Sequence, residues 1–335
     1  MRAFVFDTYQ QPAHEADVPE PVVGDQDVLI RVEAASLNHL DERIRSGEFR
    51  AILPYRPPVT LGHDLAGTVI RTGRHVSGFG IGDRVYARPR DFRIGTFAER
   101  IAVDQADLAL APASVSTVEA ASLPLVALTA WQALVDAGDV RAGQKVLVHA
   151  GAGGVGTIAI QLAKHLGATV AATASGKNAD FVRELGADVV IDYRTQDFRA
   201  ELSGYDVVLD PLGAENVLAS LTVLRPGGKV VGISGPPTPA FAKTAGLNPV
   251  VRLATAALSR KVRATAKRLG VSYEFLWVHA SGAQLRQLAQ LVDAGVVRPV
   301  VGATFPFDQT LQALQSLGSS SIRGKAVIEL PGRPA

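Results

Sequence analysis

The sequence predicts an α/β protein in which a β-rich N-terminal region precedes a doubly wound parallel sheet. Three observations support this fold class. Short β-like runs separated by Gly, Pro and Asp fill the first third of the chain, strand and helix patterns alternate after about Gln144, and a glycine-rich loop joins the first of these strands to a helix. The 335 residues are enough for two domains of ordinary size.

The pattern of short strands and turns in the N-terminal region is typical of a β-barrel or a β-sandwich. Its apolar runs are short and end at turn-forming residues, a pattern typical of antiparallel strands joined by tight connections. The predicted strands are Val28–Val32, Leu65–Ile70, Arg84–Ala87 and Phe97–Val103.

The second region reads as repeated strand–helix units. Apolar strands that alternate with helical patterns indicate a parallel sheet buried on both faces. Helices are expected from Val155 to Leu166, from Ala179 to Leu185 and from Leu285 to Val292. The expected strands are Val146–Ala150, Thr169–Ala174, Val189–Ile191, Val207–Leu209, Lys229–Ile233, Phe275–Val278 and the closing Lys325–Leu330.

A basic segment, Pro236–Gly270, interrupts this alternation. Its first part is rich in proline and its second part carries most of its arginine and lysine residues. The favoured interpretation is the solvated face of an amphipathic helix, and the second is a cationic lid over an acidic ligand or cofactor phosphate. Binding to RNA or to a membrane is the least favoured, because no aromatic residues are interleaved for stacking.

Composition excludes several classes of function. The chain has no cysteine, so disulfides, thiolate nucleophiles and cysteine-ligated zinc are ruled out. Its formal net charge of +2 gives no strong attraction to nucleic acid or to an anionic membrane. Met1–Gln11 does not resemble a signal peptide, and the apolar stretch Ala120–Leu134 is broken by Pro124 and too short to span a bilayer. We expect a cytoplasmic protein without nucleic-acid or membrane partners.

The loop after the first strand of the second region matches the G-x-G-x-x-G dinucleotide fingerprint. It runs Gly151-Ala152-Gly153-Gly154-Val155-Gly156 and stands between a buried strand and a helix, the context that makes the match specific. Gly151 is expected to permit a tight turn, Gly153 to let the backbone approach a pyrophosphate, and Gly156 to allow close helix packing. The N–H groups that begin the helix would then meet the anion.

The end of the next strand favours NADPH over NADH. An NAD enzyme usually has Asp or Glu here to bind the ribose hydroxyls, but this chain continues Ala174-Ser175-Gly176-Lys177 without an acid. Ser175 can hydrogen-bond a 2′-phosphate and Lys177 can add a positive charge.

Several motifs together resemble the medium-chain dehydrogenases/reductases, and the resemblance covers nearly the whole chain. Leu61–Val69 is similar to the family's Gly-x-(Glu/Asp)-x-x-Gly signature, and the glycine-rich loop follows at the expected place. Further matching stretches are Gly82–Val85, Gly95–Glu99, Pro124–Trp131, Tyr205–Asp210 and Arg323–Val327. Within the family, the chain looks like the zinc-independent quinone oxidoreductases and the alkenal and enone reductases.

This resemblance implies a GroES-like catalytic domain at residues 1–121 and 281–335 and a Rossmann NADPH-binding domain at residues 122–280. Asn38, Asp41 and Arg43 match the subgroup's Asn-x-x-Asp-x-Lys stretch, with Arg in place of Lys. By the same matching, the expected cofactor contacts are Arg43, Thr129, Gly151, Gly153, Gly154, Val155, Gly156, Ser175, Lys177, Tyr193, Ile233, Ser234 and Lys325.

The chemistry expected from the resemblance is hydride transfer from NADPH to a quinone or an α,β-unsaturated carbonyl. Asn38 and Tyr55 are the candidate catalytic donors to the developing oxyanion. His63 resembles a zinc-enzyme histidine but lacks the partners of a tetrahedral site, so no metal is expected and His63 is interpreted as a hydrogen-bonded loop residue. An enoyl-thioester reductase and a non-catalytic NADPH-binding sensor or scaffold remain alternatives. The strand at Phe275–Val278 predicts a homodimer through an open sheet edge.

Overall fold

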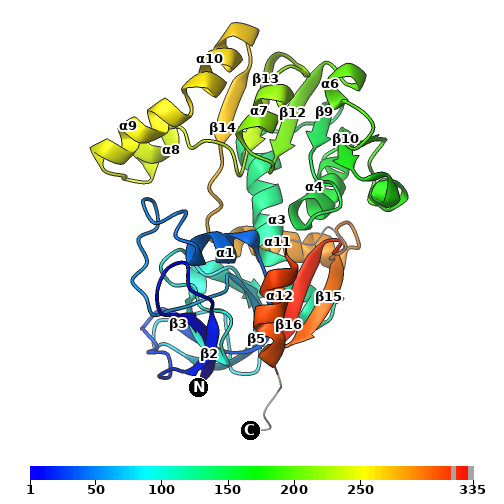
Figure 1. Ribbon diagram of the computed structural model, residues 1–335. Coiled ribbons are helices and arrows are strands. Elements are labelled where there is room, and N and C mark those ends of the chain that lie inside the picture. Colours follow the sequence, from blue (N-terminus) through cyan, green and yellow to red (C-terminus); the bar gives the residue numbers. More distant parts are fainter. Residues whose placement is uncertain (318–321, 331–335) are drawn as a thin grey trace. The chain divides into compact units, whose positions relative to one another are not determined.

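The computed structural model describes residues 1–317 and 322–330, and it divides into two units (Figure 1). Unit 1 comprises Met1–Leu128 with His279–Ala335, and unit 2 comprises Thr129–Val278. The C-terminal part of the chain therefore returns to the N-terminal unit.

Unit 1 is built from two mainly antiparallel sheets. The larger has the strand order β15-β16-β3-β5-β6-β8, with β7 also paired to β3, and the smaller has the order β2-β1-β4. The strands are β1 (Arg2–Phe6), β2 (His14–Asp17), β3 (Asp27–Ser36), β4 (Val59–Thr60), β5 (Asp64–Thr72), β6 (Arg84–Ala87), β7 (Arg100–Asp104), β8 (Leu108–Leu110), β15 (Val301–Pro306) and β16 (Lys325–Glu329).

Short helices complete unit 1. They are α1 (His39–Arg45), α2 (Thr117–Ala121), α3 (Pro124–Trp131, which continues into unit 2), α11 (Gly282–Asp293), α12 (Thr310–Ser316) and the 3₁₀ turns η1 (Gln105–Asp107) and η4 (Phe307–Gln309). Helix α11 buries Leu285, Leu288 and Val292 at helical spacing, as its sequence predicts.

Two glycines show why the Leu61–Val69 motif has its form. Gly62 has a φ of +106°, and a Cβ there would lie 2.3 Å from the Thr96 hydroxyl oxygen. A Cβ at Gly67 would lie 2.1 Å from the carbonyl oxygen of Arg31 on the paired strand β3. Neither position has room for a side chain. Asp64, the first residue of β5, lies between these two glycines in the sequence.

Unit 2 is a six-stranded sheet in the order β11-β10-β9-β12-β13-β14, and all of its strands are parallel. This is the order of the doubly wound dinucleotide-binding fold, whose ligands bind where the order reverses, between β9 and β12. The strands are β9 (Lys145–Val148), β10 (Thr169–Ala174), β11 (Val189–Asp192), β12 (Tyr205–Asp210), β13 (Leu224–Gly232) and β14 (Ser272–Phe275).

Helices lie on the faces of this sheet. They are α4 (Gly154–His165), α5 (Ala179–Glu184), α6 (Phe198–Glu201), α7 (Ala214–Ser220), α8 (Pro239–Thr244), α9 (Pro249–Leu258) and α10 (Arg260–Leu269), with the π-helical turn η2 (Gln132–Ala137) and the 3₁₀ turn η3 (Gly176–Asn178). The core beneath α7 and α10 includes Leu147, Val208 and Val230 from three adjacent strands, with Val217 and Val262 from the helices.

Two strand predictions need correction. The expected strand Phe97–Val103 begins only at Arg100, and Ala98 instead makes an isolated bridge with Ala3 of β1. The expected last strand Phe275–Val278 ends at Phe275 and begins earlier, at Ser272. Aromatic packing explains the early exit, because the rings of Phe275 and Trp277 both stack on Phe241 of α8, with centroids 5.0 and 5.9 Å away.

Strand β14 nevertheless occupies the end of the sheet. Among the residues that the structure describes, it pairs with β13 alone. An open edge of this kind can accept a strand from a second copy. The homodimer stays a prediction, with its contact now expected at Ser272–Phe275.

Candidate active site

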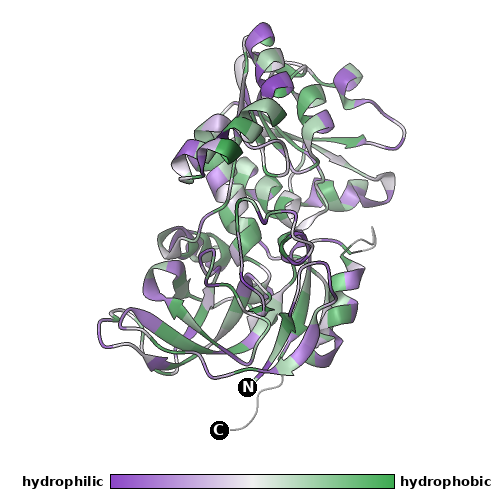
Figure 2. Cartoon of the chain, turned by 60° about the vertical axis from the view of Figure 1, so that its left-hand side comes forward, coloured by the Kyte–Doolittle hydropathy of each residue, from purple (hydrophilic) through white to green (hydrophobic). Residues whose placement is uncertain are grey.

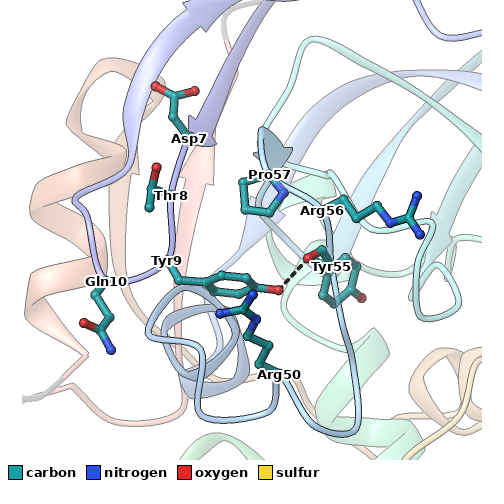
Figure 3. A pocket seen from close by; sticks show the side chains of 8 residues that line it. All are labelled: Asp7, Thr8, Tyr9, Gln10, Arg50, Tyr55, Arg56 and Pro57. Carbon is teal, nitrogen blue, oxygen red and sulfur yellow. Dashed lines mark hydrogen bonds between the residues drawn. The ribbon is translucent and has the colours of Figure 1, made fainter.

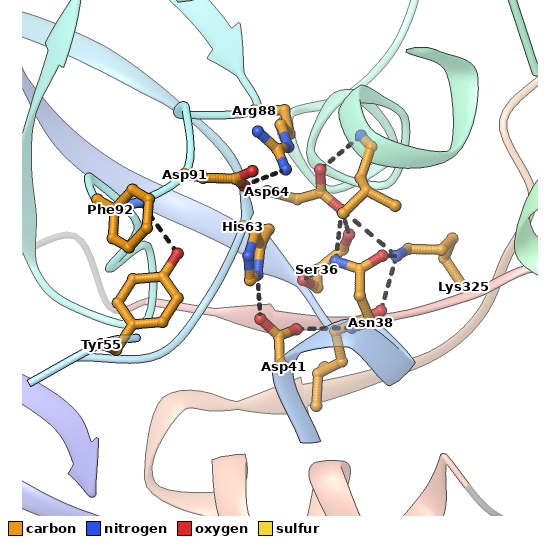
Figure 4. A network of polar contacts seen from close by, with 12 residues as sticks. Ser36, Asn38, Asp41, Tyr55, His63, Asp64, Arg88, Asp91, Phe92 and Lys325 are labelled. Carbon is orange, nitrogen blue, oxygen red and sulfur yellow. Dashed lines mark hydrogen bonds and ion pairs between the residues drawn. The ribbon is translucent and has the colours of Figure 1, made fainter. Parts of the chain in front are cut away.

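Asp64 is the centre of a buried polar cluster in unit 1 (Figure 4). Its Oδ2 accepts hydrogen bonds from the Ser36 hydroxyl at 2.7 Å, the Asn38 amide nitrogen at 2.9 Å and the Lys325 ammonium at 3.3 Å. Its Oδ1 accepts the backbone N–H of Leu125 at 2.7 Å. These donors come from β3, the N-cap of α1, α3 and β16, so one fully buried carboxylate links four segments of the chain.

Lys325 and Asn38 are hydrogen-bonded to each other inside this cluster. The Lys325 ammonium donates to the backbone oxygen of Leu37 at 2.6 Å and to Asn38 Oδ1 at 2.5 Å, as well as to Asp64. The Asn38 amide donates its two hydrogens to Asp64 and to the Ser36 carbonyl oxygen. Burial lowers the pKa of Lys325, while the carboxylates of Asp64 and Asp41 oppose that shift.

This arrangement bears on two of the predicted site residues. An ammonium has three donors and an amide nitrogen has two, and all five are used within unit 1. Lys325 therefore fixes the orientation of the Asn38 amide. Neither side chain keeps a spare N–H in this state for a substrate oxygen or a cofactor.

Asp41 and His63 form a second buried pair next to this cluster. Asp41 Oδ1 lies 2.6 Å from His63 Nδ1, and Asp41 Oδ2 accepts the backbone N–H of Asn38 at 2.8 Å. Both side chains are fully buried. His63 Nε2 is also buried, and no described residue gives it a hydrogen-bond partner. His63 is thus the hydrogen-bonded residue that the sequence predicts, with one ring nitrogen left over.

Tyr55 is packed, but its hydroxyl retains a hydrogen-bonding function. The hydroxyl oxygen accepts the backbone N–H of Phe92 at 3.0 Å, and the two rings lie 5.2 Å apart. Burial raises the pKa of Tyr55, so the phenol stays protonated at neutral pH. Its own hydrogen is not committed by the bond to Phe92, which makes Tyr55 an available donor.

An open depression lies beside the Tyr55 backbone (Figure 3). It has a volume of about 540 Å³ and is lined by Asp7, Thr8, Tyr9, Gln10, Arg50, Tyr55, Arg56 and Pro57. The Tyr9 hydroxyl donates to the Tyr55 carbonyl oxygen at 2.7 Å, and the Arg50 guanidinium stacks over the Tyr9 ring at 5.2 Å. The Tyr55 hydroxyl points away from this depression, toward Phe92.

Arg43, expected at a cofactor phosphate, is engaged within unit 1. Its guanidinium donates to both carboxylate oxygens of Glu48, at 2.8 and 2.5 Å, and stacks 4.4 Å over the Phe49 ring. The planar fork of arginine suits this bidentate pairing better than lysine would. A phosphate would have to compete with Glu48 for the same donors.

The glycine-rich loop of unit 2 is tightly packed at two of its glycines. A Cβ at Gly156 would lie 2.2 Å from the Ala150 carbonyl oxygen, so only glycine fits there. A Cβ at Gly151 would meet the Ala172 Cβ at 3.0 Å. The left-handed residue of the turn is Ala150, with a φ of +53°. The close Ala172 contact favours glycine at position 151.

The same loop leaves the start of α4 open to an anion. Gly153 is the N-cap, has no side chain to cap the helix, and has extended backbone angles. The N–H groups of Gly154, Val155 and Gly156 have no intrahelical acceptor, as is general for the first turn of a helix. A Cβ at Gly153 would meet only the Ala150 carbonyl oxygen, at 3.3 Å, so its missing side chain serves access to the backbone. These features fit a bound pyrophosphate.

A chain of buried hydrogen-bonded side chains lies next to this loop in the sequence and the sheet. His149 lies between the Thr173 hydroxyl, 3.1 Å from Nδ1, and the Ser220 hydroxyl, 3.0 Å from Nε2. The Ser220 hydroxyl is in turn 3.0 Å from Asp210 Oδ2. Thr173 also accepts the Ala150 N–H at 3.2 Å. Burial lowers the pKa of His149 to about 4, so it is neutral at pH 7, and burial raises the pKa of Asp210.

The end of β10 carries the residues expected at the adenosine end. Ser175 is buried and precedes η3, Lys177 is exposed, and Tyr193 is 58% exposed beside the Arg194 guanidinium, 5.8 Å from its ring. The adjacent strand adds an acid that the sequence analysis missed. Asp192 pairs with Ala174, and its Oδ2 lies 2.6 Å from where a Gly176 Cβ would stand.

Three further predicted residues lie in unit 2. Thr129 is buried in α3, whereas Ile233 and Ser234 are partly exposed after the end of β13. The Ile233 N–H donates to the Asp210 carbonyl oxygen at 3.0 Å, which places this segment at the carboxyl ends of β12 and β13. That edge of a parallel sheet is where ligands of this fold bind.

Comparison with known proteins agrees with this architecture. Residues 24–113 match the alcohol dehydrogenase GroES-like domain, and residues 185–328 match the zinc-binding dehydrogenase family. A chloroplastic NADPH-dependent alkenal/one oxidoreductase of Arabidopsis thaliana is 35% identical, with 98% of this chain and 79% of that protein covered. The chain belongs to the medium-chain dehydrogenase/reductase family. Within it, the chain falls among the quinone oxidoreductase and alkenal reductase-like proteins.

Two further relatives span both units. A chloroplastic quinone oxidoreductase of Triphysaria versicolor is 32% identical over 98% of each chain. The solved structure of a quinone oxidoreductase from Coxiella burnetii has a TM-score of 0.84 and 30% identity, covering 99% of each chain. The GroES-like and Rossmann fold predicted from the sequence is thereby confirmed, and the chain is an oxidoreductase of the NAD(P)H-dependent type.

Proposed function

We propose that this chain is a zinc-independent, NADPH-dependent oxidoreductase that reduces a quinone or an α,β-unsaturated carbonyl. The observation that carries the proposal is the open N-terminus of α4 at Gly153–Gly156, a preformed pyrophosphate site in a member of the quinone oxidoreductase-like branch. The names of the relatives supply the acceptor class, since they include a quinone oxidoreductase and an alkenal/one oxidoreductase.

The cofactor is assigned to residues of unit 2. Gly153, Gly154, Val155 and Gly156 would hold the pyrophosphate through backbone N–H groups, while Gly151 keeps the turn compact. Thr129, Ile233 and Ser234 would lie along the nicotinamide part. When bound, NADPH supplies a hydride from its nicotinamide ring.

Selectivity for NADPH rests on Ser175 and Lys177, with Tyr193 against the adenosine. Asp192 acts in the opposite direction, because a carboxylate near Gly176 repels a 2′-phosphate. Lys177 and Arg194 are exposed cations, and Arg194 follows Asp192 by two positions. Their positive charges would oppose that repulsion. The balance of the three charges sets the preference.

Unit 1 would supply the groups that act on the acceptor. Tyr55 is the preferred donor to the oxygen that becomes negative, because its proton is retained by a raised pKa and its hydroxyl is not fully used. Asn38 is assigned a positioning role, since its amide hydrogens are already bonded to Asp64 and Ser36. Zinc independence rests on the absence of any cysteine from the sequence.

A panel assay tests the proposal. NADPH oxidation is followed with a simple quinone, a short alkenal and an enoyl-thioester, before and after dialysis against a strong chelator. Turnover with the quinone or the alkenal, unchanged by the chelator, is the expected result. Turnover with the thioester alone would favour an enoyl-thioester reductase. NADPH binding without turnover on any acceptor would favour a sensor or scaffold.

A further inference from the structure

The basic segment of unit 2 exposes an apolar stripe that its sequence alone did not reveal. Val250, Leu253 and Leu258 of α9 are 77%, 74% and 65% exposed. With Ala254 and Ala257, which are also exposed, they recur at the spacing that places residues on one side of a helix. The other side of α9 is anchored to the unit, because Thr255 and the following Ser259 are buried.

The segment that carries the stripe is also rich in cations that have no acidic partner in an ion pair among the described residues. From Pro236 to Tyr273 the sequence contains no Asp or Glu, but it has seven basic residues, all exposed: Lys243, Arg252, Arg260, Lys261, Arg263, Lys267 and Arg268. None of the ion pairs among the described residues includes any of them. Helix α10 supplies five of these charges and buries Val262 and Ala266. Figure 1 labels α9 and α10, and Figure 2 shows purple, hydrophilic positions on helices of the same unit.

The contacts of two of these arginines hold the helices in place without neutralising their charge. Arg252 Nε donates to the Leu247 carbonyl oxygen at 2.6 Å. Arg263 donates to the Ser259 hydroxyl at 3.1 Å and to the Ala256 carbonyl oxygen at 3.0 Å, which bridges the α9–α10 junction. These hydrogen bonds stabilise the pair of helices, α9 and α10, that carries the stripe and the cations.

We propose that the α9–α10 surface docks on an anionic phospholipid membrane. An amphipathic helix at a membrane interface inserts an apolar face among the acyl chains while lysine and arginine meet the headgroup phosphates. The stripe of α9 supplies the apolar face and the seven cations supply the charge. No helix of the described residues is long and apolar enough to cross a membrane, so the attachment is to the surface.

Charge argues against the other occupants of this face. A twofold dimer places the same patch against itself, which would bring seven cations of one copy against seven of the other. Nucleic acid would meet the charges but leave the three aliphatic side chains against phosphate, without exposed aromatic rings for stacking. The ring of Phe241, the one aromatic residue of the segment before Tyr273, is packed on Phe275 and Trp277.

Co-sedimentation of the full chain with lipid vesicles tests the proposal. One set of vesicles is pure phosphatidylcholine and the other is mixed with phosphatidylglycerol, both at low ionic strength. The apolar variant carries Val250→Gln, Leu253→Gln and Leu258→Gln, and the charge variant carries Arg260→Gln, Lys261→Gln, Lys267→Gln and Arg268→Gln. The controls carry two substitutions each: Val22→Gln with Ile81→Gln, at exposed apolar residues of unit 1, and Arg71→Gln with Arg286→Gln, at exposed arginines.

The unsubstituted chain is expected to sediment with the anionic vesicles and not with the neutral ones. Each α9–α10 variant should weaken this binding by about tenfold or more, whereas both controls bind like the unsubstituted chain. NADPH-dependent turnover should be retained in every variant. The experiment therefore tests membrane docking independently of the proposed enzymatic function.

Three results would overturn the proposal. The unsubstituted chain could stay in the supernatant with anionic vesicles. The apolar variant could bind the anionic vesicles as well as the unsubstituted chain does. Equal binding of a single-stranded oligonucleotide to both proteins would then indicate a surface for polyanions. Light scattering could show that the apolar variant halves the mass, which would make a second copy the occupant. If the apolar variant does not fold, hydrogen exchange of the unsubstituted chain decides, because docking predicts vesicle-dependent protection in α9.

Discussion

The carboxylate of Asp41 lies 2.6 Å from His63 Nδ1, and both side chains are completely buried. Asp41 also accepts the backbone N–H of Asn38, so it acts as an acceptor on both oxygens. The hydrogen of this contact is therefore assigned to His63 Nδ1, and the buried Nε2 has no hydrogen-bond partner among the described residues. One carboxylate thus fixes both a ring orientation and the start of the helix that carries Asn38.

Asp41→Ala is predicted to lower the free energy of unfolding by about 3 kcal/mol. The substitution leaves the buried Asn38 N–H and His63 Nδ1 without an acceptor, and each hydrogen bond to a charged group contributes about 1.5–3 kcal/mol. Urea unfolding measures the effect. Asp180→Ala is the control, because Asp180 is 93% exposed in its ion pair with Arg183 and should cost under about 1 kcal/mol. Equal losses in the two variants would show that the buried pair has no special importance.

Gly153→Ala is predicted to separate cofactor binding from folding. A Cβ at Gly153 would make one tight contact, 3.3 Å from the Ala150 carbonyl oxygen, which a shift of a few tenths of an ångström relieves, so stability should fall by less than about 1 kcal/mol. The methyl group would stand between the backbone and a pyrophosphate, and NADPH affinity should fall about tenfold or more. Isothermal titration calorimetry measures the NADPH affinity, and thermal unfolding measures the stability.

Two alanine variants serve as references for that experiment. Gly156→Ala should lose both stability and binding, because its Cβ would collide with the Ala150 oxygen at 2.2 Å. Gly80→Ala, whose Cβ would meet nothing nearer than 3.8 Å, should lose neither. An unchanged NADPH affinity in Gly153→Ala would place the cofactor elsewhere.

Lys177→Ala is predicted to weaken NADPH and leave NADH nearly unchanged. A hydrogen bond to a charged phosphate contributes about 1.5–3 kcal/mol, which corresponds to a loss of roughly tenfold or more. Lys145→Ala, at another exposed lysine of the same unit, is the control. Equal affinities of the unsubstituted chain for the two cofactors would refute the assigned selectivity, and would point to Asp192 as the stronger influence.

His149 is predicted to make unit 2 sensitive to acid. Its pKa in the folded state is about 4, below the ordinary value of 6.5, so the unfolded chain takes up a proton first as the pH falls. The stability conferred by neutral His149 is complete above about pH 6.5 and declines as the pH falls toward 4, with a loss of about 2 kcal/mol at pH 5. His149→Gln should show a correspondingly smaller drop in urea midpoint between pH 7 and pH 5. An identical drop in both proteins would contradict the assignment.

Local patterns predicted the fold well because its signals are short-range. Strand β10 has the predicted bounds Thr169–Ala174, and the constraint on Gly156 follows from the spacing of the glycines. The strand at Phe275–Val278 was misplaced because its end depends on packing against Phe241, 34 positions earlier than Phe275. Periodicity carries no information about such a contact.

The candidate site was less predictable for the same reason. The sequence shows that Asn38, Asp64 and Lys325 occur, but not that their donors and acceptors satisfy one another across separations of up to 287 positions. Asp192 was missed because only strand pairing brings it to Gly176. The exposed stripe of α9 was missed because an apolar helical face is buried in most proteins.

Deuterium transfer tests the central claim most directly. The chain is incubated with an enone and with NADPH that carries deuterium at the transferable position of the nicotinamide ring, and the product is examined by NMR and mass spectrometry. The account predicts a saturated ketone with one deuterium on the carbon β to the carbonyl. Deuterium on the carbonyl carbon, in an allylic alcohol, would show alcohol dehydrogenase chemistry and contradict the account.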